Sequence, residues 1–167
     1  GQVMKDLEKA VAELRSRGMR GLIVDLRQNP GGLLDVARDL CDQFVGDGVI
    51  VSVKGREKIA DAIYRATPGD QLEETPLVVL IDGGSASASE IFAGCIRDHD
   101  RGILVGARTY GKGSVQNIID LGGGQALKLT TARYYTPDDK PIEDRKGIAP
   151  DVLIPMPLEH MVALRNQ

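Results

Sequence analysis

The first two-thirds of the chain alternates between helix-like and strand-like hydrophobic patterns. Residues 2–17 carry apolar side chains every three or four positions, which predicts an amphipathic helix that ends at Gly18. The same spacing predicts two further helices, over residues 34–44 and 86–98. Short, nearly continuous apolar runs are typical of buried strands, and the chain has four of them. They are residues 22–26, 49–53, 77–82 and 103–105.

Beyond Gly113 the pattern changes to the alternation that is typical of β-hairpins. Residues 114–121 and 126–136 predict two strands around a Gly-Gly-Gly turn at 122–124. Residues 55–67 fit either a helix or an extended ribbon, and we interpret them as a ribbon. We expect a polar excursion over 137–150, a last strand at 152–154 and a short helix near 158–164.

Strands that alternate with helices imply crossover connections, so we predict an α/β fold with a largely parallel core sheet and flanking helices. Ligands of such sheets bind beyond the carboxyl ends of the strands. Two chemically suggestive loops follow predicted strands, Arg-Gln-Asn-Pro-Gly-Gly at 27–32 and Asp-Gly-Gly-Ser-Ala-Ser-Ala-Ser at 82–89.

With 167 residues, the chain is long enough for one domain, which we place at residues 1–155, followed by a tail at 156–167. A net charge of −3, 4% aromatic residues and no Trp argue against a nucleic-acid partner. Cys41 and Cys95 fall on apolar helix faces, which favours paired or free core thiols over reactive ones. Within this chain we see no signal peptide, transmembrane run or lipidation motif.

Three serines, Ser85, Ser87 and Ser89, are candidate nucleophiles in the second loop. Ser87 and Glu90 also match a capping box, in which a serine begins a helix and a glutamate reaches back to it. The two interpretations are compatible, because a serine at a strand-to-helix turn lies at the positive end of the helix. An oxyanion formed there could accept a hydrogen bond from the Ala88 amide.

We expect a lysine, and not a histidine, as the base that would activate such a serine. His99 lies roughly 18 Å along the same predicted helix from Ser87, and His160 lies in the tail. Lys112 stands between Gly111 and Gly113, and a lysine that has lost its proton by desolvation can act as a general base. A surface lysine in a glycine turn remains the alternative; a phosphate-binding loop is only partly matched.

Two further elements complete the candidate site. Gln116 follows Lys112 by four residues, so its amide could hold the lysine amine in place. The amides of Gly31 and Gly32 could form an anion-binding nest and donate to an oxyanion. An ordinary strand-to-helix turn is the alternative interpretation of these two glycines.

Taken together, these residues resemble the protease domain of the C-terminal processing (tail-specific) peptidases. The matching segments cover most of the chain in the family's order, and they are residues 21–34, 84–94, 106–116 and 127–152. The resemblance implies a fold like that of the Clp protease and crotonase group, with a C-terminal β-hairpin region. The PDZ domain and the strand that normally precede the first helix are absent from this chain.

The resemblance also implies an activity and its residues. The family is a group of serine endopeptidases that cleave near the C-termini of extracytoplasmic proteins (periplasmic or thylakoid-lumenal) and need no metal or organic cofactor. Its serine-lysine dyad maps to Ser87 and Lys112, with Gln116 in support. The oxyanion donors map to Ala88 and to one of Gly31 and Gly32, with Gly31 slightly preferred. We expect a protein or peptide substrate with an apolar C-terminus, and membrane association only through segments outside the chain.

Two other functions fit a related fold. One is a non-catalytic module that binds retinoids or fatty acids in an apolar groove, and the other is a crotonase-like thioester enzyme. The intact pairing of Ser87 with Lys112 favours the peptidase over both.

Overall fold

The computed structural model describes residues 2–56, 61–69, 72 and 75–155. Helices form close to where the apolar spacing predicts them, as α1 (Gln2–Ser16), α2 (Leu34–Cys41) and α3 (Ala88–Asp98). The strands are β1 (Leu22–Asp25), β2 (Val49–Gly55), β3 (Ala62–Arg65), β4 (Leu77–Ile81), β5 (Ile103–Gly106), β6 (Ser114–Gly122), β7 (Gln125–Tyr135) and β8 (Val152–Leu153). The helix expected near 158–164, His160 and the tail lie outside the described residues.

A four-stranded parallel sheet with the order β1-β4-β5-β8 confirms the expected α/β core. Strand β2, however, does not join this sheet, although it follows a helix. It pairs antiparallel with β3 and β7 in a second sheet of order β3-β2-β7-β6. The partner β3 follows β2 within a few residues, so closing that ribbon costs less chain entropy than a second crossover. Strand β3 confirms the ribbon interpretation for the part of 55–67 that the structure describes, and residues 57–60 lie outside it.

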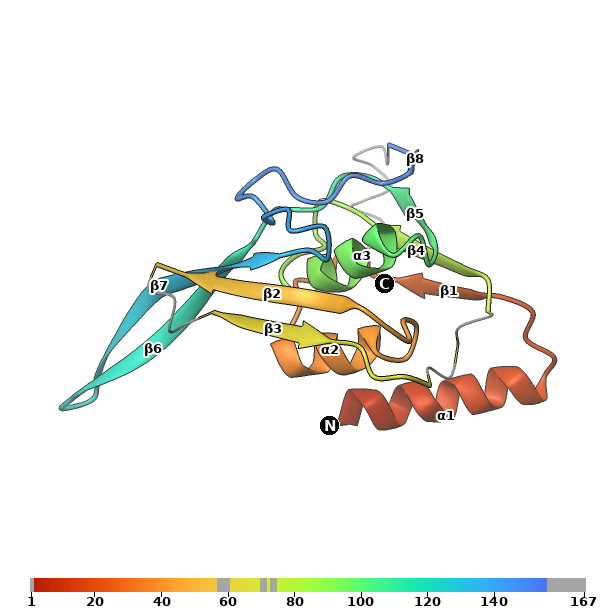
Figure 1. The fold of residues 1–167 in the computed structure, drawn as a ribbon, viewed down its shortest axis with the longest axis horizontal. Coiled ribbons are helices and arrows are strands. Elements are labelled where there is room, and N and C mark those ends of the chain that lie inside the picture. Colours follow the sequence, from red (N-terminus) through yellow and green to blue (C-terminus); the bar gives the residue numbers. More distant parts are fainter. Residues whose placement is uncertain (1, 57–60, 70–71, 73–74, 156–167) are drawn as a thin grey trace.

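Helix α3 lies at the centre of the fold and packs against α2, β2 and β5, so it touches both sheets (Figure 1). Residues Ser89 to Ile96 of this helix are all buried. Strand β4 of the parallel sheet leads directly into the loop before α3, and this loop and the start of α3 carry the serine cluster.

Residues 137–150 are more than the polar excursion that the sequence indicates. Ile142 is 1% exposed and Ile148 is 4% exposed, and both belong to the main core cluster. The segment is anchored by these two side chains and folds over the loop that contains Lys112.

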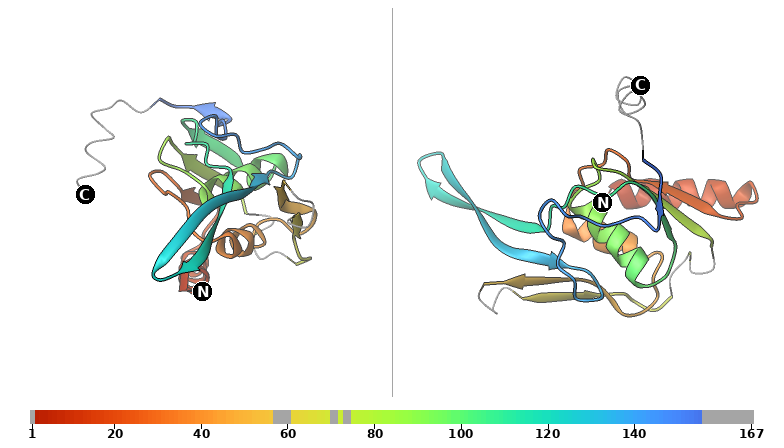
Figure 2. Two further views of the ribbon diagram at one scale, coloured as in Figure 1. Left: turned by 90° about the vertical axis from the view of Figure 1, so that its left-hand side faces the viewer. Right: turned by 90° about the horizontal axis from the view of Figure 1, so that it is seen from above.

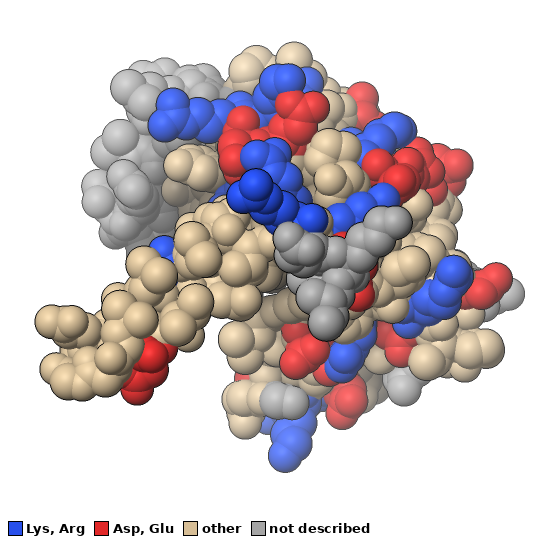
Figure 3. Space-filling model, turned by 60° about the vertical axis from the view of Figure 1, so that its left-hand side comes forward, with Lys and Arg blue, Asp and Glu red and all other residues tan. Residues whose placement is uncertain are grey.

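Strands β6 and β7 form a long hairpin that projects from the body of the molecule (Figure 2). Its outer part is almost free of charged side chains (Figure 3) and exposes several aliphatic ones, among them Ile118 and Leu121. None of the helices in the described residues is both long and apolar enough to cross a membrane.

Candidate active site

Two loops meet at the carboxyl ends of the adjacent parallel strands β1 and β4. The Asn29 carbonyl accepts a hydrogen bond from the Ala86 amide at 3.0 Å and another from the Ser89 hydroxyl at 3.1 Å. The loop that holds Gly31 and Gly32 is therefore fixed directly to the loop that holds the serines, as the position of both loops at strand ends predicts.

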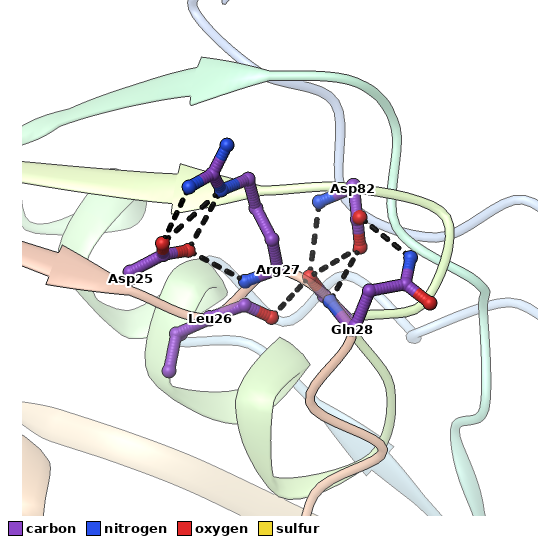
Figure 4. A network of polar contacts seen from close by, with 6 residues as sticks. Asp25, Leu26, Arg27, Gln28 and Asp82 are labelled. Atoms are coloured by element: carbon purple, nitrogen blue, oxygen red, sulfur yellow. Dashed lines mark hydrogen bonds and ion pairs between the residues drawn. The ribbon is translucent and has the colours of Figure 1, made fainter. Parts of the chain in front are cut away.

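Asp82 follows the last residue of β4 and connects these two loops (Figure 4). Its carboxylate accepts the Gln28 amide at 2.9 Å, the Gln28 side-chain amide at 2.7 Å and the Gly84 amide at 2.8 Å. Burial by itself raises the pKa of Asp82, but these hydrogen bonds outweigh it and hold the pKa below its usual value. Asp25 forms a separate pair with Arg27, whose hydrogen bonds lower the pKa of the Asp25 carboxyl (Figure 4).

The three candidate serines have different surroundings. The Ser85 hydroxyl is fully buried and donates to the Leu26 carbonyl at 2.7 Å, while the Ser89 hydroxyl donates to Asn29. Both hydroxyls thus bind backbone. Among the described residues, only Ser87 of the three gives its hydroxyl proton to no acceptor, and its side chain is half-buried at the surface of the loop.

Ser87 also has an unusual backbone conformation, with φ 56° and ψ −115° immediately before the first residue of α3. A non-glycine residue in such a conformation costs of order 1–3 kcal/mol and persists only where its surroundings enforce it. Strained residues at a sharp turn between a strand and a helix are typical of exposed nucleophiles.

Glu90 is the group that enforces this arrangement, and it is fully buried. One carboxylate oxygen accepts the Ser87 amide at 2.9 Å and the Lys112 amide at 2.7 Å. The other accepts the Thr109 hydroxyl at 2.6 Å and the Gly111 amide at 2.7 Å. The predicted capping interaction from Glu90 to Ser87 is present. The same side chain also joins the serine loop to the lysine loop.

The backbone of the lysine loop is closely packed, whereas its lysine side chain is exposed to solvent. A Cβ atom on Gly111 would lie 2.6 Å from the Arg145 amide nitrogen, and one on Gly113 would overlap the Ile142 carbonyl. The two glycines therefore allow a close backbone approach that a side chain at either position would prevent. The side chains of Lys112 and Gln116 are exposed, and among the described residues the Lys112 amine has no hydrogen-bond or ion-pair partner.

The amides at the oxyanion position differ in availability. The Gly31 amide donates to the Asn29 side chain at 2.9 Å, and Gly31 has a φ of +89°. The amides of Gly32 and Ala88 have no acceptor among the described residues. Two free amides therefore border the turn that contains Ser87.

An apolar cavity of about 360 Å³ opens beside these amides. Its walls come from the Asn29–Leu33 turn, α2, the start of α3 and Val3 of α1. The aliphatic and aromatic side chains that line it include Leu26, Leu33, Val36, Ala37, Leu40 and Phe92.

The remaining candidates lie away from this site. His99 follows the last residue of α3 and its ring binds the Val49 carbonyl at 2.7 Å, which confirms that it is remote from Ser87. Within the described residues, no group of three or more His, Cys, Asp or Glu side chains could hold a metal ion.

Sequence patterns alone missed the wider roles of Glu90, Asp82 and Thr109. Each residue is an ordinary helix-cap or loop residue when it is considered locally. The only available signal was that Glu90 is an acidic residue on the buried face of a strongly apolar helix, where an ionised side chain requires partners.

Comparison with known proteins agrees with this geometry. Residues 1–154 match the model of peptidase family S41. A carboxy-terminal-processing protease of Bartonella bacilliformis is 46% identical over 161 residues, which are 94% of this chain and 37% of that protein. The chloroplastic carboxyl-terminal-processing peptidase 3 of Arabidopsis thaliana is 45% identical over 88% of this chain and 28% of its own length.

The solved structures give the same result. A photosystem II D1 C-terminal processing protease superimposes with a TM-score of 0.81 at 37% identity, over 89% of this chain and 38% of that one. The fold, the two loops and the similar proteins together identify this chain as a member of the peptidases. More specifically, the chain belongs to peptidase family S41. It spans about a third of the length of these relatives.

Proposed function

We propose that this domain is the catalytic part of a serine endopeptidase that cleaves proteins near their C-termini, with Ser87 as nucleophile and Lys112 as general base. The observation that carries the proposal is the shared Glu90 oxygen, which accepts the amides of both residues. The two backbones therefore lie no farther apart than these two hydrogen bonds allow, although 25 residues separate them in sequence.

In the proposed reaction, the uncharged Lys112 amine removes the Ser87 hydroxyl proton while the serine oxygen attacks the scissile carbonyl. Lys112 then gives this proton to the leaving amine, and an acyl-enzyme ester remains on Ser87. A water molecule, deprotonated by Lys112, hydrolyses the ester and releases the acid product. Gln116 supports the lysine amine. Because the Lys112 side chain is exposed, we infer that a bound substrate chain covers it and supplies the desolvation that the base requires.

The tetrahedral oxyanion is held by the Ala88 amide and by a glycine of the first loop. We now favour Gly32 over Gly31, because the Gly31 amide already donates to Asn29 whereas the Gly32 amide is free. The adjacent cavity receives the apolar side chain of the residue that provides the scissile carbonyl. The apolar cavity suits protein substrates with apolar C-terminal regions. We place these substrates in the periplasm or a comparable lumen.

The test is cleavage of an unstructured peptide with an apolar C-terminal region, followed by mass spectrometry. Ser87→Ala and Lys112→Ala should each lower kcat/KM by roughly 10⁴-fold or more while the circular dichroism spectrum is unchanged. Lys140→Ala, at an exposed lysine paired with Asp138, is the matched control and should leave activity unchanged. Activity that survives either substitution in the site contradicts the dyad.

The alternative of a retinoid- or fatty acid-binding module has no counterpart among the relatives named above, all of which are proteases by description. We therefore do not propose a second function.

A further inference from the structure

The core contains two thiols that the proposed reaction does not use. Cys41 is the last residue of α2 and Cys95 lies in the last turn of α3, and both are free cysteines with no exposed surface. Neither contributes to the cavity or to the hydrogen-bond network at Ser87.

The packing of α2 against α3 brings these thiols to the same contact. The rings of Phe44 and Phe92 meet edge to face, with their centroids 5.5 Å apart. Phe92 precedes Cys95 by three residues and so shares its face of α3. Phe44 follows Cys41 by three residues, and its amide donates to the Cys41 carbonyl at 2.9 Å, which continues the helical turn.

The two thiols are also direct neighbours. Burial, followed by hydrogen bonding with the Cys95 thiol, raises the pKa of Cys41. A dithiol of this kind is inert while it is closed in the core, because the thiolate is the reactive form.

We propose that Cys41 and Cys95 form a redox-sensitive pair, which closes to a disulfide between α2 and α3 when the protein meets a disulfide oxidant. During a transient opening, one cysteine thiolate attacks a sulfur of the oxidant, forms a mixed disulfide and releases one thiol. The second cysteine thiolate attacks the mixed disulfide, forms the Cys41–Cys95 bond and releases the second thiol. The two cysteine protons end on the two released thiols, so the protein is oxidised by two electrons and the oxidant is reduced by two.

The new bond would act on stability and not on the reacting groups. It closes a loop of about 50 residues, which restricts the unfolded chain. It lies two helical turns beyond Ser87 on α3 and at the far end of α2 from Gly32. The proposal is therefore independent of the proposed peptidase reaction.

The experiment treats the whole 167-residue chain with oxidised glutathione in native buffer, against a sample kept in dithiothreitol. Thiols are counted in guanidinium with a chromogenic disulfide, and the intact mass and the midpoint of thermal unfolding are measured. We expect both thiols to disappear together, the mass to fall by about 2 Da and the midpoint to rise by about 5 °C. Digestion should yield the peptides around Cys41 and Cys95 as one linked species, and dithiothreitol should reverse every change.

Cys41→Ala and Cys95→Ala are the matched controls, since each keeps one thiol and should show no rise in midpoint with the oxidant. Should either fail to fold, the thiol count of the unsubstituted chain still decides. The proposal is overturned if both thiols survive prolonged treatment, including treatment in denaturant just below the unfolding midpoint. Glutathione adducts, intermolecular dimers or a lowered midpoint would overturn it as well.

Discussion

The serine loop and the lysine loop are joined by one carboxylate, yet their side chains are in opposite situations. Around Ser87, the neighbouring hydroxyls of Ser85 and Ser89 bind backbone, and the helix behind them is buried in the core. Around Lys112, the flanking glycines pack closely against the 142–147 segment, but the lysine side chain is exposed to solvent. The loop continues into the projecting β6–β7 hairpin.

This difference indicates which groups the fold holds rigidly and which it leaves free to move. Catalytic geometry requires that the nucleophile and the oxyanion donors be held in place before the substrate arrives. A lysine base has a further requirement, the removal of water from its amine, and a substrate chain can supply that when it binds. The domain therefore fixes the backbone of both members of the proposed dyad, while the Ser87 side chain is half-buried and the Lys112 side chain is exposed.

The largest effect is expected from Glu90→Gln, which removes the carboxylate that joins the serine loop to the lysine loop. A glutamine can accept hydrogen bonds with its oxygen, but its amide nitrogen would face either the Ser87 and Lys112 amides or the Gly111 amide and the Thr109 hydroxyl. In either orientation at least one backbone amide loses its acceptor. We expect a loss of about 2–6 kcal/mol in the free energy of unfolding, measured with urea. The misplaced loops should also lower kcat/KM by at least about 100-fold.

Glu143→Gln is the matched control, because Glu143 lies in the segment that covers Gly111 and its exposed side chain pairs with Lys146. It should change stability by no more than about 1 kcal/mol. If Glu90→Gln behaves like this control, the carboxylate does not hold the two loops together.

The sequence predicted the elements of this site better than the contacts between them. Hydrophobic spacing predicted a helix over 86–98, close to the observed Ala88–Asp98, because a buried helix after a buried strand leaves a strong periodic signal. The role of Glu90 toward Thr109 and Lys112 could not be read in this way, since those contacts span 19 and 22 residues. Of the hydrogen bonds that Glu90 accepts, local spacing predicts only the short-range one from the Ser87 amide.

The same limit explains the other differences. Ile142 and Ile148 are isolated apolar residues in a polar segment, so no periodicity marks them as core. The choice of partner for β2 depends on β7, which lies about 80 residues further along the chain. In both cases tertiary packing decides what local pattern leaves open.

A second comparison, within the serine side, uses the neighbouring glycines of the first loop. Gly31→Ala places a methyl group at a positive φ and 2.7 Å from the Ala88 amide nitrogen, whereas a Cβ on Gly32 meets nothing within 4 Å. We expect Gly31→Ala to lower the free energy of unfolding by about 2–4 kcal/mol and to reduce peptide cleavage, because it pushes the turn against Ser87.

Gly32→Ala should stay within about 0.5 kcal/mol of the unsubstituted protein, because its added methyl group meets only open space. Urea unfolding and peptide cleavage of the two variants side by side provide the measurement. Equal effects of the two substitutions would show that the turn is not packed against the serine loop as described.

A smaller loss than that of Gly31→Ala is expected at the Asp82 carboxylate, which accepts an amide of the serine loop, and this loss depends on pH. The pKa of Asp82 is lowered in the folded protein, so its contribution to stability is present above the unfolded pKa of about 3.8 and is lost as the pH falls through the folded pKa. Asp82→Asn should cost about 1–2 kcal/mol at pH 7, since the amide keeps only part of the hydrogen bonding to Gln28 and Gly84.

Below pH 3.8 the unsubstituted protein loses the same contribution, so the two unfolding curves should converge. Urea titrations at pH 7, 5 and 3 measure this difference, with the exposed Asp35→Asn as control. A gap that stays constant from pH 7 to 3 would mean that the ionised carboxylate does not stabilise the loop.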